Sequence, residues 1–424
     1  MALGNTSASL DALLKELYSP DRVVNTIFSK NVLLGMLSKD EKQVGRNYDV
    51  PMIINAGQGR SNTFSVAQNN ASKTGEQAVV FQIPMVENHA VANISTAVIQ
   101  QTDDQRGGWV KAMALVMDNQ LLNFANDVSF NIYTTSAGIR GTIDASTTIA
   151  SGTIKLTKPS DALNFCRGME LDAVTSATAS APEAYGSAAH GLVVGSVDYV
   201  QGTLSILQDF NGSAATNLAD GTYGIPTIAA GMGLVQRGDF KLKMFGMQDW
   251  LVYGGPTNTP FCGVDRTLNP TFLAGHWMDG TTTGGLVPTL ELAIAQVAAT
   301  GGEVDTFMVS HRKFAKLAIE IGSKVQLSER QSTASQGYTG IQVVGATGPC
   351  VVLPDRTCPE DRVFGLNMST WTLRSSKKAI RIYDDDGLTW LRSTNQSGME
   401  ARWYSRANLH CSDPRQNIVI KVAA

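Results

Sequence analysis

Charged side chains are scarce in this sequence. Asp, Glu, Lys and Arg make up 17% of the 424 residues, against about 25% in an average soluble domain. A free monomer usually carries a charged coat that keeps it in solution, so the shortage predicts that much of the surface is covered by other molecules. The net charge of −3 also excludes the strongly basic balance that is typical of proteins that grip nucleic acid.

Signals for membranes, secretion and disulfides are missing as well. No run of 18 apolar residues is present, so the sequence predicts no contact with a membrane. The first residues lack the basic and then apolar layout of a signal peptide. The five cysteines are too widely spaced for a disulfide framework or a metal site, and we expect buried free thiols in a protein made in a reducing compartment.

Motifs of catalysis and cofactor binding are not found. The sequence has no phosphate loop, no dinucleotide fingerprint, no GxSxG and no HExxH, and its five histidines stand apart. One acidic run, Asp384-Asp385-Asp386, has the ligand type that Mg²⁺ or Ca²⁺ prefers, but it lacks the alternating spacing of a calcium loop. The run also suits a solvated turn after a strand. The sequence therefore predicts no enzyme, no cofactor and no metal, with a metal-dependent enzyme that uses Asp384–Asp386 as the alternative from another class.

Residues 1–47 are expected to form a helical arm. Leu10, Leu13, Leu14 and Leu17 fall at helical spacing, and Pro20 suits the first position of a second helix. Segments this short are not stable alone in water. We expect the arm to pack on the body of the chain or on a neighbouring subunit.

Residues 48–100 are expected to form a long β-hairpin. Strand patterns at residues 48–54 and 78–99 flank a polar tract of more than twenty residues, and Pro51 indicates an edge strand. Long loops in compact domains are usually functional or disordered. We therefore expect a projecting hairpin whose tip is held by a partner.

A long helix is expected within residues 101–139. Thr102 and Gln105 form a capping box, and an apolar stripe continues to about Tyr133. The candidate contacts between subunits lie in the hairpin and at the start of this helix. They are Arg60, Lys73, Arg106 and Trp109.

Residues 140–255 are expected to form an inserted β-rich domain, a small barrel or sandwich, because short strand patterns alternate with turn residues. The expected strands are residues 153–156, 169–174, 192–197, 202–207, 241–245 and 250–253.

Residues 256–400 alternate between helix and strand patterns and are expected to form an α/β domain. Pro288 and Ser310 suit helix starts, and residues 328–338 suit a polar loop. Residues 401–424 predict strands that return to one of the earlier sheets. The fold class is α+β.

This order of elements resembles the major capsid proteins of tailed bacteriophages, which have the HK97-type fold. The stretch YDVPMIINAGQGR at residues 48–60, with the polar tract after it, looks like the extended loop of that family. Residues 102–133 look like its spine helix, and residues 290–327, with the run IGSKVQ, look like its axial domain. Residues 341–349 and 382–388 also look like stretches of phage capsid sequences.

The resemblance implies a subunit that assembles with itself, as hexamers and pentamers, into an icosahedral shell around double-stranded DNA without sequence-specific binding. It further implies a virion capsid assembled in the host bacterial cytoplasm, with a portal protein and, in some members, a decoration protein. Because the hairpin begins near residue 48, a separate scaffolding protein is expected. Lys73 is the only lysine between Lys42 and Lys111, but no partner for a covalent cross-link is identified. The alternative within this fold is an encapsulin-like nanocompartment.

Overall fold

The structure is a computed structural model. It describes residues 31–43, 45–55, 57–73, 75–96, 108–147, 152–182, 192–207, 228–321, 327–331, 337–376, 381–382, 391–393 and 397–423. The two helices expected before residue 31, the candidate contact Arg106 and the run Asp384–Asp386 lie outside these ranges.

A mixed sheet, here called the spine sheet, is organised around one long strand. This strand, β20 (Gly398–Cys411), pairs with β4 (Val86–Ser95), β17 (Trp371–Ser375), β18 (Arg381–Ile382) and β19 (Leu391–Arg392). The short β1 (Ser38–Asp40) adds to β17 in parallel. The long helix α5 (Gly108–Tyr133) packs on this sheet through Phe124, which meets Ala92 and Trp403.

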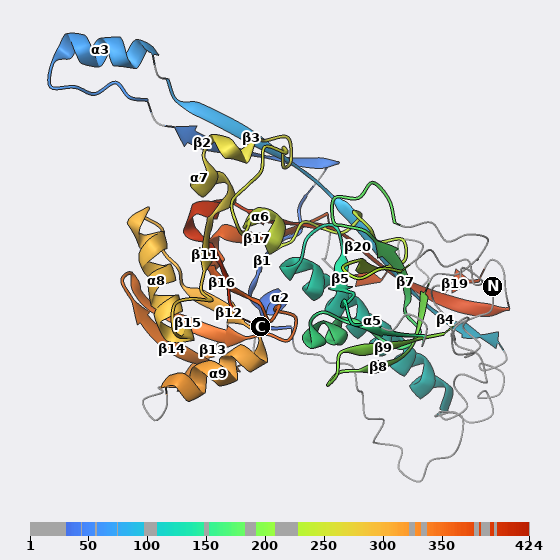
Figure 1. Cartoon of the computed structure of the whole chain (residues 1–424). Coiled ribbons are helices and arrows are strands. Elements are labelled where there is room, and N and C mark those ends of the chain that lie inside the picture. Colours follow the sequence, from blue (N-terminus) through green and yellow to red (C-terminus); the bar gives the residue numbers. More distant parts are fainter. Residues whose placement is uncertain are drawn as a thin grey trace.

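A second sheet, the axial sheet, has seven strands among the described residues. Their order is β11 (His276–Asp279), β21 (Ile418–Lys421), β16 (Arg362–Leu366), β12 (Thr306–Val309), β15 (Gly348–Pro354), β14 (Gly337–Gly345) and β13 (Leu327–Gln331). Helices α8 (Leu286–Ala299) and α9 (His311–Ile321) pack on this sheet through a shared apolar core (Figure 1). The mixture of helices and strands agrees with the α+β class.

A third sheet, the inserted sheet, lies beside α5 (Figure 1). Its six strands follow the order β5 (Ile139–Thr142), β10 (Gly233–Gln236), β7 (Glu170–Val174), β8 (Leu192–Asp198), β9 (Thr203–Leu207) and β6 (Thr153–Lys155). A 3-10 turn, η2 (Pro159–Asn164), packs beside it.

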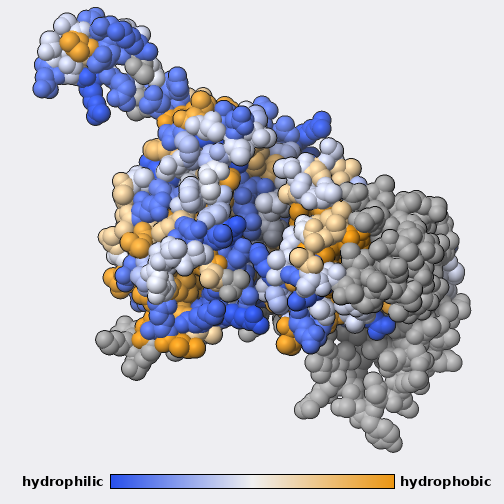
Figure 2. All heavy atoms as spheres, in the orientation of Figure 1, coloured by the Kyte–Doolittle hydropathy of each residue, from blue (hydrophilic) through white to orange (hydrophobic). Residues whose placement is uncertain are grey.

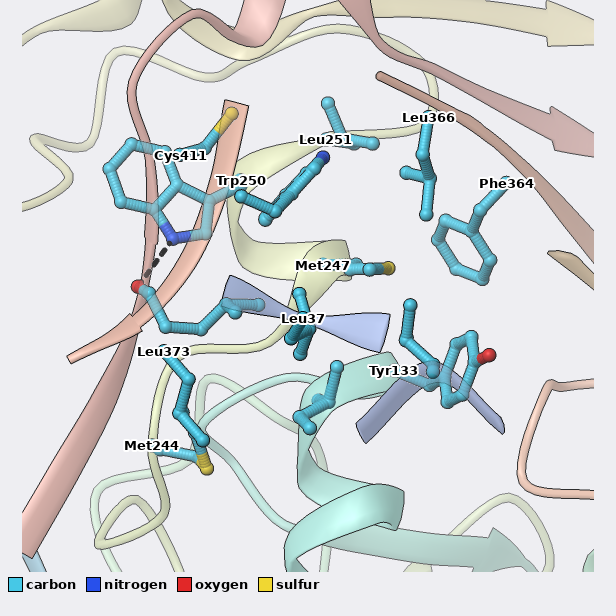
Figure 3. Packing of buried hydrophobic residues seen from close by; sticks show 14 of the residues in the cluster. Leu37, Tyr133, Met244, Met247, Trp250, Leu251, Phe364, Leu366, Leu373 and Cys411 are labelled. Atoms are coloured by element: carbon cyan, nitrogen blue, oxygen red, sulfur yellow. Dashed lines mark hydrogen bonds between the residues drawn. The ribbon is translucent and has the colours of Figure 1, made fainter. Parts of the chain in front are cut away.

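The largest core joins the spine sheet, the axial sheet and α5. Figure 3 shows part of it, where Met247 and Trp250 of the short helix α6 (Met247–Trp250) lie near Leu37, Tyr133 and Phe364. Helix α2 (Val32–Met36) adds Leu33 to the same core, and α7 (Pro270–Ala274) adds Leu273.

Three expectations about secondary structure are wrong. Residues 241–245 and 250–253 form no strands, because Lys241 has a left-handed φ of 57° and residues 247–250 form α6, which belongs to the large core. The inserted sheet therefore ends at Gln236, well before residue 255. The expected loop at 328–338 is largely a hairpin, since β13 pairs with β14.

The cysteines differ from the expectation at two positions. All five are free thiols, and Cys350, Cys358 and Cys411 are buried, but Cys262 is half-buried and Cys166 is exposed. Among the helices of the described residues, none is both long enough and apolar enough to cross a membrane.

Candidate functional site

A two-stranded hairpin projects from the body and carries a helix at its far end (Figure 1). Strand β2 (Asn47–Asn55) pairs antiparallel with β3 (Gln77–Pro84), and helix α3 (Phe64–Lys73) lies in the connection between them. The hairpin forms a sheet of its own, so Pro51 lies on a strand whose outer edge has no paired strand among the described residues. This placement removes no ladder hydrogen bond on that edge and agrees with the edge position that Pro51 predicts.

One face of the hairpin is fastened to the body by an aromatic cluster. Phe81 is fully buried, and its ring lies 5.5 Å from Trp250 and 6.3 Å from Phe261, measured between ring centroids. Phe261 in turn meets Trp250 at 5.2 Å and Phe245 at 4.9 Å, both edge to face. Such aromatic contacts add to the free energy gained from burial, so the base of the hairpin is held rigidly.

Hydrogen bonds fix the direction in which the hairpin leaves the body. The amide of Asn269 donates to the carbonyl oxygen of Ile54 at 3.2 Å, and the amide of Asn408 donates to that of Pro84 at 2.7 Å. The backbone N–H of Gln82 donates to the carbonyl oxygen of Cys262 at 3.0 Å. These bonds tie β2 and β3 to the body near both ends of the hairpin ladder, because Pro84 pairs with Asn47 and Ile54 lies at the end next to Gln77.

A buried arginine, Arg266, and a buried carboxyl group, Asp249, lie beside the cluster. The Arg266 guanidinium lies 4.3 Å from the Phe261 ring centroid and donates to the carbonyl oxygens of Asp249 and Trp250. Burial raises the pKa of Asp249 to about 6, although the backbone N–H groups of Ser136 and Gly246 donate to its carboxylate. Burial likewise lowers the pKa of Arg266 to about 10.

The far end of the hairpin has no contact with the core. Helix α3 contains no buried residue, and the Phe64 side chain is 83% exposed. Ile53 and Val80, on the outer face of the strands, are 66% and 45% exposed. Figure 2 shows this end as a mostly hydrophilic surface with an isolated apolar group. An exposed apolar ring on a helix that has no buried residue is a candidate contact for another molecule.

The candidate contact residues are only partly brought together. Arg60 lies exposed in the loop before α3, and Lys73 lies exposed at the last position of α3. Trp109 lies in the first turn of α5, which belongs to the spine and not to the hairpin tip. Arg106 lies outside the described residues.

The helix at the tip and the anchors at the base were not predicted. Helix α3 lies within the tract for which the sequence predicts a polar loop, and a weak local signal for the helix is Thr63, a residue type that suits the position directly before a helix. Gly59 lies so close to Ala71 that an added Cβ would come within 2.8 Å of the alanine methyl. The anchors Phe261 and Asn408 carry no signal in the sequence, because they meet the hairpin only through the fold.

The structure of the whole chain is similar to solved structures of capsid proteins. The capsid asymmetric unit of cyanophage A-1(L) matches with a TM-score of 0.53 at 10% sequence identity, and the match covers 98% of each chain. The chain has the fold of that capsid subunit. The HK97-type fold that the sequence resemblance implied is thereby confirmed.

More distant capsid-like structures match at lower scores. The native GTA particle capsid gives a TM-score of 0.46 at 10% identity, covering 99% of this chain and 100% of the other. The holo-SrpI encapsulin of Synechococcus elongatus gives 0.46 at 6% identity, covering 99% of this chain and 96% of the other. Compared with protein-family models and with curated proteins, the sequence gives no match.

No group of three or more His, Cys, Asp or Glu side chains within the described part of the chain is arranged to hold a metal ion. The expected alternative centre, Asp384–Asp386, lies outside the described residues.

Proposed function

We propose that this chain is a major capsid protein, which assembles with itself into a closed icosahedral shell around phage double-stranded DNA. The observation that carries the proposal is the match to the cyanophage capsid subunit over 98% of both chains. A match of this extent leaves no large part of the chain to form a separate catalytic domain.

The projecting hairpin supports a role in assembly. Its base is rigid, because Phe81 is fully buried and both strands are hydrogen-bonded to the body. Its tip is exposed and carries Phe64 together with the cations Arg60 and Lys73. A rigid lever with an exposed apolar end is suited to reach across a neighbouring copy, and contacts that repeat head to tail close into rings.

The proposed partners follow from a shell of this kind. Copies of the chain form hexamers and pentamers, a separate scaffolding protein guides assembly in the bacterial cytoplasm, and a portal protein is part of the shell. A decoration protein is a further proposed partner on the finished virion. The net charge of −3 fits a wall that encloses DNA without binding its phosphates at every subunit.

Electron microscopy of the purified chain tests the proposal directly. We expect closed isometric shells, and native particles are expected to contain DNA that resists nuclease until the shell is opened. Shells filled with a protein cargo and free of nucleic acid would indicate a nanocompartment like an encapsulin. Small oligomers under all assembly conditions would contradict both.

Removing the hairpin tip tests how the shell is held together. Replacing residues 56–76 with an Asn-Gly turn joins the paired Asn55 and Gln77 by a two-residue loop, keeps β2 and β3 paired and is expected to leave a folded subunit that forms no stable shells. The control is Val200→Ser, which removes an 82% exposed apolar side chain from the inserted sheet. Shells of normal stability from the chain without the tip would refute the role of the hairpin.

A further inference from the structure

The inserted sheet has a hydrophobic core of its own. Its buried residues include Phe165, Leu171, Val194 and Leu234, and none of the residues in this cluster belongs to the axial or the spine sheet. A body with a separate core moves as a unit when its contacts to the rest of the chain are few and polar.

The chain enters and leaves this body through backbone that favours a hinge. Gly138 precedes β5 with a φ of 72°, and Gly238 and Lys241 follow β10 with φ values of 82° and 57°. These left-handed residues lie next to a small cluster that contains Ala137 and Phe240. Hinges are commonly a few residues at the ends of elements.

One carboxylate forms ion pairs with both segments through which the chain enters and leaves the inserted sheet. Asp127, on α5, forms ion pairs with Arg140 of β5 and, at 2.8 Å, with Lys243, which follows β10. Lys243 also pairs with Asp239 at 2.8 Å. Burial alone would raise the pKa of Asp127, but the charges of Arg140 and Lys243 outweigh it and hold that pKa well below its usual range. Asp127 therefore stays ionised, and its ion pairs with Arg140 and Lys243 stay formed, at all pH values near neutrality.

The side of the inserted sheet that carries β5 and η2 faces the start of α9 and the loop after β15 across a cavity of about 790 Å³, and Arg140 also lines this cavity. The polar contacts across it include an ion pair between Lys158 and Asp361 at 2.8 Å and a hydrogen bond from the Arg356 guanidinium to the carbonyl oxygen of Leu163 at 3.0 Å. Figure 1 shows the inserted and axial sheets on opposite sides of the molecule's centre. Charged side chains from both sides line this cavity, whereas Arg140 and Lys243 at Asp127 are largely buried.

Asp161 projects into this contact from η2. On the opposing loop lie two further carboxylates, Glu360 and Asp361, and all three line the cavity. We propose that the inserted sheet is a hinged unit that pivots at Asp127, and that its docking on the axial sheet is controlled by protonation of Asp161. The proposal concerns a motion within one subunit and does not rest on the proposed function.

The charged and titratable groups around Asp161 come from several elements that line the cavity. They are Lys158 directly before η2, Arg140 on β5, Tyr199 on the β8–β9 turn, His311 and Arg312 at the start of α9, Arg356, Cys358, Glu360 and Asp361 on the loop after β15, and Arg362 at the start of β16. Burial raises the pKa of Asp161 to about 7, Lys158 opposes this, and the negative charges of Asp361 and Glu360 add to it. Asp161 is therefore protonated in the docked state at mildly acidic pH.

The direction of the effect follows from proton linkage. When the sheets separate, the Asp161 carboxyl is hydrated and returns towards its ordinary pKa of 3.8. The docked state then binds the proton more tightly, so docking weakens as pH rises from about 4 to about 7 and changes no further above that. One proton gives at most about a tenfold change in the docking constant for each pH unit.

Distances between two spin labels in the full chain test the proposal. Labels are placed with Ala145→Cys on the inserted sheet and Ala315→Cys on α9, both exposed positions, in a chain where Cys166→Ser removes the exposed native thiol. We expect a short distance at pH 5, a growing population at longer distance up to pH 7, and no further change at pH 8. Asp161→Asn is expected to keep the short distance at every pH.

Control variants separate Asp161 from its neighbours. Glu303→Gln, an exposed carboxylate outside the cavity, and His311→Gln, the histidine in its wall, are expected to respond as the parent chain does. Glu360→Gln removes one like charge, so the response is expected to level off at a lower pH, which keeps the test usable if Asp161→Asn fails to fold. A distance that ignores pH, a response that survives Asp161→Asn, or one that disappears with His311→Gln would overturn the proposal.

Discussion

Truncation of two phenylalanines of the hairpin is expected to affect different properties, the stability of the subunit for Phe81 and the assembly of shells for Phe64. Phe81 at the base is fully buried between Trp250 and Phe261, so Phe81→Ala leaves a cavity in the aromatic cluster. Such a change costs about 3–5 kcal/mol of unfolding free energy. Phe64 at the tip is 83% exposed and packs on no core residue, so Phe64→Ala is expected to change that free energy by no more than about 0.5 kcal/mol.

Urea unfolding of the dissociated subunit measures the first effect, and shell formation measures the second. With slopes of about 1–3 kcal/mol per molar urea, Phe81→Ala lowers the unfolding midpoint by on the order of 1 M or more. Phe64→Ala keeps the midpoint but reduces the yield of shells seen by electron microscopy. Equal unfolding midpoints for the two variants, or full shell yield from Phe64→Ala, would refute the division of the hairpin into a structural base and an assembling tip.

Three further predictions concern the body of the subunit. Asp127→Asn leaves two buried cations without their counter-charge and is expected to lower the free energy of unfolding in urea at pH 7 by roughly 3–5 kcal/mol. Because the pKa of Asp127 lies below its ordinary 3.8, the stabilisation by its carboxylate is present above pH 4 and lost in stronger acid, where the variant and the parent chain reach the same unfolding free energy. Gly246→Ala places a Cβ on the carbonyl oxygen of Thr134 and is expected to lower the melting temperature by many degrees, whereas Gly75→Ala, with open space around it, leaves it unchanged. In a thiol-reagent titration of the native chain, Cys166 is expected to react first and the buried cysteines only after denaturant is added, since burial raises the pKa of Cys350 to about 11.

Local sequence patterns predicted those elements whose apolar residues fall on the face that the structure buries. Helix α8 begins two residues before Pro288, and α9 begins directly after Ser310, close to the two expected helix starts. The two strands of the hairpin were also expected, although the second ends at Pro84 and a new strand begins at Val86. Residue periodicity reports which face of an element is buried, and these elements bury a regular face.

Tertiary context decided the elements that were missed. The apolar residues around Trp250 look like a strand, but they form a short helix because Trp250 and Met247 enter the large core. The polar strand β13 forms because β14 offers it a partner. At the hairpin, the sequence predicts exposed cations at Arg60 and Lys73, but the aromatic ring of Phe261 reaches the base from more than 170 residues further along the chain. No local pattern encodes such a contact.

The pairing of β4 with β20 has a consequence for synthesis of the chain on the ribosome. Ser95 pairs with Gly398 and Val86 with Ala407, so more than 300 residues separate the two strands in sequence. At a synthesis rate of about 5–20 residues per second, roughly 15–60 s pass before β4 meets its partner. During that interval the apolar face of β4, and the face of α5 that packs on it, lack the strand that completes their core. The nascent chain therefore needs either a holding chaperone or a transient substitute contact until its last residues emerge.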